Sequence, residues 1–245
     1  MGDRYKHQIA IEDIGIDGQT KLSNSSVLVI GAGGLGTFVS SFLASMGIGK
    51  LGIVDFDKVE KSNLTRQILY SEENIGKPKA SILAKRLGEL NSEIQIEGFL
   101  SRIEDESNTN LFREYDIICD CTDNLNTRMA IDRFCHSIQK PLVYAAVGGW
   151  EGYVTVLHAK NKIGLSDVLP LEEYAMNKPM NCSNFGIIAT TCSIAGSMQA
   201  NEIIKVILGL NNNLDGYLMC FNSAKNVYRK FKILKNTVEQ SSRSQ

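Results

Sequence analysis

"SVLVIGAGGLG", the stretch Ser26–Gly36, decides the fold of this chain. Its first half is a short apolar run, Val27–Ile30, of the kind that forms a buried strand. Gly-x-Gly-x-x-Gly follows at Gly31, Gly33 and Gly36, and an apolar-periodic helix ending at Gly47 comes next. This order is typical of a dinucleotide-binding turn, whose backbone lies close to a phosphate at a helix start. The motif alone does not say which nucleotide is bound.

The rest of the first 150 residues repeats the alternation of strand and helix. Apolar runs predict further strands at Lys50–Asp55, 94–99, Tyr115–Asp120 and Pro141–Val147, and helical spacing predicts helices at Lys77–Asn91 and 124–138. Strands that are apolar throughout indicate a parallel sheet covered on both faces. We therefore predict an α/β fold with a doubly wound, Rossmann-like, mostly parallel sheet.

The pattern changes after residue 150. Gly152–His158 alternates like an antiparallel strand, Ala159–Phe185 has little periodicity, and Gly186–Gly209 reads as a long buried helix. Residues 216–234 predict a closing hairpin, which makes an antiparallel C-terminal extension of the sheet. We predict a single domain over residues 1–234 and a polar, disordered tail over 235–245.

Composition excludes several classes of function. With 26 basic and 27 acidic residues the net charge is −1, so we expect no nucleic-acid partner. No apolar run approaches the roughly 20 residues of a membrane span, and the N-terminus has no signal-peptide core. The six cysteines form no C-x-x-C pair, which favours reduced thiols in a cytoplasmic protein.

Polar residues after the second strand indicate the kind of nucleotide. Asp55 ends that strand, where a ribose-binding acid belongs, and Asp57 is a second acid. Asn63, Arg66 and Gln67 share one face of a helical turn. An NAD site has little use for Arg66, whereas ATP needs cations because charge builds up as pyrophosphate leaves.

Two more segments add to this group. Lys77 and Lys79 lie near a helix start, and Asp123 and Asn124 follow the fourth strand at its carboxyl end, where open α/β sheets bind ligands. A carboxylate facing a triphosphate suits Mg²⁺. Taken singly, Arg66 and Lys79 also fit a solvated basic face, and Asp123 fits a helix N-cap. Their joint placement favours ATP with Mg²⁺.

The segments GAGGLGT, VDFDKVEKSNLTRQ, GKPKA and DCTDN occur in this order, and from about Arg4 to Leu234 the chain resembles the ThiF/MoeB/HesA family. These are bacterial relatives of ubiquitin-activating enzymes. The resemblance implies a homodimeric nucleotidyltransferase that binds Mg-ATP. It adenylates the C-terminal Gly-Gly carboxylate of a small ubiquitin-like carrier of the ThiS/MoaD type, with release of pyrophosphate. It also implies a sulfur donor protein, in thiamine, molybdopterin or another sulfur pathway.

The resemblance assigns roles residue by residue. It places Gly34 and its neighbours at the phosphates and Asp55 at the ribose. Asn63, Arg66 and Lys79 are expected to contact the triphosphate, and Asp123 to position Mg²⁺.

Three features depart from the family pattern. The opening RYKHQ has His7 where an arginine is expected to reach the partner subunit's ATP; either His7, Arg4 or Lys6 does this work, or His7 is only a dimer contact. The chain lacks the two C-x-x-C pairs of many relatives, so we expect no zinc. Cys182 stands where a family cysteine can accept the carrier or a persulfide, although an ordinary loop cysteine fits as well.

Other functions remain open from the sequence. The same fold can adenylate another carboxylate or a tRNA base, although no appended recognition domain is evident. An NAD(P)-dependent oxidoreductase would use the same glycine motif, but Arg66, Lys79 and Asp123 argue against it. His7 and the missing zinc ligands also allow a non-catalytic binder of a ubiquitin-like protein.

Overall fold

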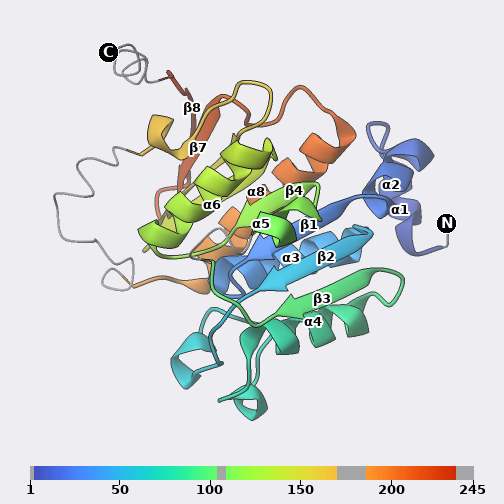
Figure 1. Ribbon diagram of the computed structural model, residues 1–245, viewed down its shortest axis with the longest axis vertical. Coiled ribbons are helices and arrows are strands. Elements are labelled where there is room, and N and C mark those ends of the chain that lie inside the picture. Colours follow the sequence, from blue (N-terminus) through green and yellow to red (C-terminus); the bar gives the residue numbers. More distant parts are fainter. Residues whose placement is uncertain (1–2, 104–108, 170–185, 236–245) are drawn as a thin grey trace.

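The computed structural model describes residues 3–103, 109–169 and 186–235. Its strands form a single eight-stranded sheet in the order β3-β2-β1-β4-β5-β6-β7-β8 (Figure 1). β1 to β5 pair in parallel, and β5 to β8 pair antiparallel. The strands are β1 Ser26–Ile30, β2 Lys50–Val54, β3 Gln95–Phe99, β4 Ile117–Asp120, β5 Leu142–Gly148, β6 Glu151–Leu157, β7 Tyr217–Asn222 and β8 Val227–Lys232. The predicted α/β class and the antiparallel extension are confirmed.

Helices cover both faces of the sheet, which is why its central strands are apolar throughout. Val27 and Val29 of β1 belong to a core formed with α3, α4 and α8. Leu28 and Ile30, which point the other way, belong to a second core formed with α5 and α6. The α-helices are α1 Lys6–Ile9, α2 Gly15–Ser23, α3 Gly34–Met46, α4 Lys79–Leu90, α5 Thr109–Arg113, α6 Leu125–Ile138 and α8 Ala189–Leu208.

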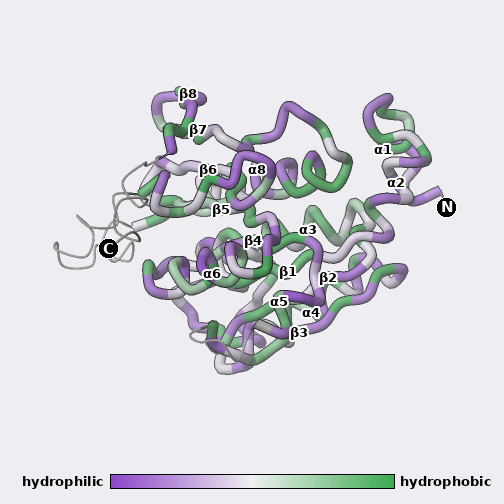
Figure 2. Tube along the Cα trace, turned by 45° about the horizontal axis from the view of Figure 1, so that its top comes forward, coloured by the Kyte–Doolittle hydropathy of each residue, from purple (hydrophilic) through white to green (hydrophobic). Residues whose placement is uncertain are grey.

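Short 3₁₀ helices join these elements: η1 Asp3–Tyr5, η2 Lys61–Asn63, η3 Glu72–Asn74 and η5 Leu165–Asp167. Figure 2 shows the hydrophobic colour concentrated along the central strands, whereas the outer strand β8 is largely hydrophilic, and all six of its residues are exposed. β8 is therefore an edge strand protected by its charges.

The structure refines several predicted boundaries. α4 begins at Lys79, with Pro78 as its N-cap residue, so the helix starts later than the sequence pattern indicates. α2 forms upstream of β1, where no element was predicted.

Cys182 and almost all of the 235–245 tail lie outside the described residues. The single-domain boundary at residue 234 therefore stays a prediction.

Candidate functional site

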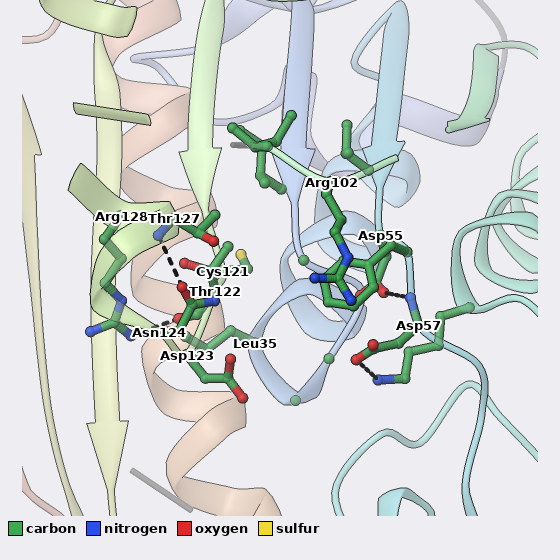
Figure 3. A pocket seen from close by; sticks show the side chains of 18 of the residues that line it. Leu35, Asp55, Asp57, Arg102, Cys121, Thr122, Asp123, Asn124, Thr127 and Arg128 are labelled. Carbon is green, nitrogen blue, oxygen red and sulfur yellow. Dashed lines mark hydrogen bonds and ion pairs between the residues drawn. The ribbon is translucent and has the colours of Figure 1, made fainter. Parts of the chain in front are cut away.

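A cavity of about 860 Å³ lies at the carboxyl ends of β1, β2 and β4 (Figure 3). Strand register explains its position, because Ile30 pairs with Val54 on one side and with Asp120 on the other. The segments that follow these three strands therefore meet at one edge, where the strand order reverses. Every predicted nucleotide-binding residue except Gly36 and Lys77 lines this cavity.

The glycine turn is required by close backbone packing. Gly31 has φ of +98°, and a Cβ there would lie 2.6 Å from the Cys121 carbonyl oxygen. A Cβ on Gly36 would lie 1.8 Å from the Gly31 oxygen, which no side chain can tolerate. Gly36 thus packs directly against the backbone of Gly31 within the turn. Gly33 and Gly34 line the cavity at the start of α3.

Asp55 ties the glycine turn to β2. Its Oδ2 accepts a hydrogen bond from the Ala32 N–H at 2.7 Å, and its Oδ1 accepts one from the Asp57 N–H at 2.7 Å. Burial raises the pKa of this carboxyl, and the two N–H donors oppose the rise. Its predicted contact with a ribose would use the remaining lone pairs of the same oxygens.

Asn63, Arg66 and Gln67 do share one turn. The N–H groups of Arg66 and Gln67 both donate to the Asn63 carbonyl, at 3.1 and 3.0 Å. Gln67 is 3% exposed, and its Oε1 has no hydrogen-bond partner within the described residues. An unpaired buried acceptor beside a cavity is costly in the free protein, so it is available to a ligand.

Asp123 and Asn124 have different positions in the structure: Asn124 caps α6, and Asp123 faces the cavity. Asn124 is the N-cap of α6, and its side chain accepts from the Thr127 N–H at 2.9 Å. The N-cap alternative therefore applies to Asn124 and not to Asp123. The Asp123 carboxylate is exposed to the cavity, with no hydrogen bond or ion pair recorded among the described residues (Figure 3). Exposed carboxylate oxygens beside the glycine turn are ligands of a kind that fits Mg²⁺.

Some cavity residues were missed from the sequence. The Arg102 guanidinium lies 3.9 Å from the centre of the Phe56 ring, at the mouth of the cavity. Arg102 follows β3 as Asp123 follows β4, so strand ends could have indicated it. Cys192 is buried but also lines the cavity, in the first turn of α8. Burial raises the pKa of its thiol to about 11, although Arg66 acts in the opposite direction.

The remaining predicted residues lie elsewhere. His7 is exposed on α1, which lies away from the carboxyl end of β1 (Figure 1). Tyr5, two residues before His7, packs against Gly47. His7 is not part of its own chain's cavity, and Lys77 does not line it either. Arg4 is engaged with Leu90 and Glu93.

Within residues 3–103, 109–169 and 186–235, no group of three or more potential metal-ligating side chains comes together. The expected absence of zinc stays a prediction. No described helix is long and apolar enough to cross a membrane.

Comparisons with known proteins agree with this architecture. A sulfur carrier protein adenylyltransferase of Thermus thermophilus is 35% identical over 96% of this chain and 88% of its own length. A probable molybdopterin-synthase adenylyltransferase of Gracilaria tenuistipitata is 37% identical over 96% and 66%. An adenylyltransferase and sulfurtransferase MOCS3 of Xenopus laevis is 38% identical, and this chain spans 51% of it.

Among solved structures, E. coli MccB with ATP has a TM-score of 0.81 at 22% identity, covering 97% of this chain and 74% of that one. This likeness supports the fold. The model of the ThiF family matches residues 5–242. The chain belongs to the ThiF family.

Proposed function

We propose that this protein is an ATP-dependent adenylyltransferase that activates the C-terminal Gly-Gly carboxylate of a small ubiquitin-like sulfur carrier. The observation that carries the proposal is one cavity that holds the glycine turn, the cations Arg66 and Lys79, and the unpaired carboxylate of Asp123. A hydride-transfer site has no use for this combination. The relatives named for sulfur carrier and molybdopterin-synthase adenylation support the same class of reaction.

The reaction needs charge neutralisation more than proton transfer. The carrier's terminal carboxylate, ionised at pH 7, attacks the α-phosphate, the bond to the β-phosphate breaks, and the products are an acyl-adenylate and pyrophosphate. The start of α3 and its free N–H groups face the phosphates. Arg66 and Lys79 offset the charge that develops on the leaving pyrophosphate.

Asp123 would hold Mg²⁺ together with phosphate oxygens, and the ion would neutralise further phosphate charge. Glu60 and Asp57 also line the cavity, but Asp57 is engaged by Lys79, which leaves Asp123 as the better ligand. No side chain is needed as a general base, so catalysis rests on positioning and electrostatics.

The partners follow from the same proposal. His7 does not line its own chain's cavity, and we propose a homodimer in which it serves the other subunit's ATP. Cys182 would accept the carrier or a persulfide from a sulfur donor protein. We propose a cytoplasmic location, and thiamine and molybdopterin pathways both fit the activity.

ATP–pyrophosphate exchange tests the proposal. We expect exchange only with a carrier ending in Gly-Gly, and the matched control is the same carrier without its last glycine. Calorimetric titration should show binding of Mg-ATP and none of NAD. Binding of NAD alone would overturn the nucleotide assignment, and a protein that binds ATP and carrier without exchange would be a non-catalytic binder.

A further inference from the structure

Two ionisable side chains, Asp120 and Arg128, are buried next to Asp123, and Arg128 also lines the cavity. Asp120, the last residue of β4, is 0% exposed, and Arg128, the fourth residue of α6, is 7% exposed. Burying charges costs free energy that apolar residues of the same size would avoid. Their presence therefore calls for a reason other than stability.

Both charges act on one residue, Thr122. Asp120 Oδ1 accepts from the Thr122 N–H at 2.8 Å and from its hydroxyl at 2.7 Å. Arg128 Nη2 donates to the Thr122 carbonyl at 2.6 Å (Figure 3). Arg128 Nη1 donates to the Tyr144 hydroxyl at 3.1 Å. The two backbone polar groups and the hydroxyl of Thr122 are thus all hydrogen-bonded to Asp120 or Arg128.

Asp123 lies in the chain between Thr122 and Asn124, which are both held by hydrogen bonds. On its other side, Asn124 is fixed by its cap on the Thr127 N–H at 2.9 Å. The backbone that enters and leaves Asp123 is held at both ends, while its own carboxylate remains unengaged within the described residues. Such an arrangement aims a side chain without using its ligand atoms.

We propose that Asp120 and Arg128 are positioning residues that aim the Asp123 carboxylate at the metal-bound triphosphate. This inference rests on the proposed function, because it gives Asp123 a metal to hold. Arg128 needs its planar fork to reach Thr122 and Tyr144 together, and a lysine supplies the charge but only one point of contact. The side chain at position 120 must accept hydrogen bonds from two donors of Thr122. The amide oxygen of an asparagine can accept both bonds without carrying a charge.

The test compares Arg128→Lys and Asp120→Asn with the control Tyr144→Phe. The control removes the outer bond of Arg128 and leaves every bond to Thr122. We measure affinity for Mn²⁺-ATP by electron paramagnetic resonance, affinity for metal-free ATP by calorimetry, thermal unfolding, and kcat and KM of exchange. We expect Arg128→Lys to weaken Mn²⁺ binding about 10- to 100-fold, the usual loss for a residue behind a metal ligand.

Metal-free ATP should bind nearly as well as to the unmodified protein, because its contacts are the glycine turn and Arg66. Asp120→Asn should retain more of the metal affinity than Asp120→Ala, and Tyr144→Phe should retain nearly all of it. Equal losses for ATP with and without metal, or unchanged Mn²⁺ affinity in folded variants, would overturn the positioning role. If Arg128→Lys does not fold, Thr122→Val decides the question, since it deletes only the hydroxyl bonded to Asp120. Absence of exchange in the unmodified protein would instead contradict the proposed function.

Discussion

The ammonium group of Lys79 lies 3.1 Å from the Asp57 carboxylate, at the first residue of α4. A positive charge is unfavourable at a helix N-terminus, and Asp57 offsets it. A backbone hydrogen bond joins the same two residues, because the Lys79 N–H donates to the Asp57 carbonyl at 2.9 Å. This pair holds an almost fully buried cation against the phosphate side of the cavity.

Lys79→Met should therefore reduce both ATP affinity and exchange. The substitution keeps the apolar stem but removes the charge, so we expect a loss of about 100-fold in kcat/KM. Lys77→Met is the control, because Lys77 lies two residues away and outside the cavity. Similar kinetics in the two variants would show that Lys79 only anchors α4.

Arg66→Ala and Asp123→Ala should each lower ATP–pyrophosphate exchange by roughly 100-fold or more, the usual scale for one transition-state electrostatic contact. Asp123→Ala should in addition weaken the dependence of the rate on Mg²⁺ concentration. Lys61→Ala, at an exposed position before the Arg66 turn, is the matched control. Unchanged rates would mean that the triphosphate binds elsewhere.

Gly34→Ala should destabilise the protein through Cys192. The new Cβ would lie 2.9 Å from the Cys192 Sγ, closer than side-chain carbons approach. We expect a loss of about 1–3 kcal/mol in the free energy of unfolding by urea, as for other overpacked sites. Cys192→Ala should recover most of that loss in the double variant. Additive effects would contradict direct contact between the two positions.

Alkylation of Cys192 should be slow at neutral pH and strongly pH-dependent. With its pKa raised to about 11, the thiolate fraction and hence the rate should rise about tenfold per pH unit between pH 7 and 9. Iodoacetamide labelling followed by mass spectrometry of the Cys192 peptide measures this rate, and bound ATP should lower it. Rapid labelling at pH 7 would contradict the raised pKa.

His7→Arg should retain or raise exchange, because arginine adds a fixed charge and a two-pronged donor for phosphate. A mixing experiment tests whether His7 acts across a dimer. Neither His7→Ala nor Arg66→Ala protein alone has an intact site, but a mixed dimer would contain one. Recovery of exchange on mixing supports action across subunits, and no recovery contradicts it.

Local sequence patterns determined the β1–turn–α3 unit, because the apolar strand and its glycines specify their backbone over neighbouring residues. They also placed Asp55, Asp57 and Asp123 at one sheet edge, since carboxyl ends of parallel strands meet there. Arg66 was predicted from its spacing to Asn63 within a single turn. These inferences need only short-range geometry and the parallel direction of the strands.

Tertiary structure alone decided which of Asp123 and Asn124 caps α6, and so which carboxylate faces the cavity. It also decided that Cys192 of α8 packs under Gly34 and that Asp120 and Arg128 converge on Thr122. The packing of Cys192 against Gly34 joins segments far apart in the chain. The cap and the bonds to Thr122 are short-range, but periodicity and spacing do not encode which neighbouring side chain makes each bond. Local sequence preferences determined the strands, turns and helices that carry the site. The contacts made in the folded chain determined which side-chain atoms remain available to a ligand.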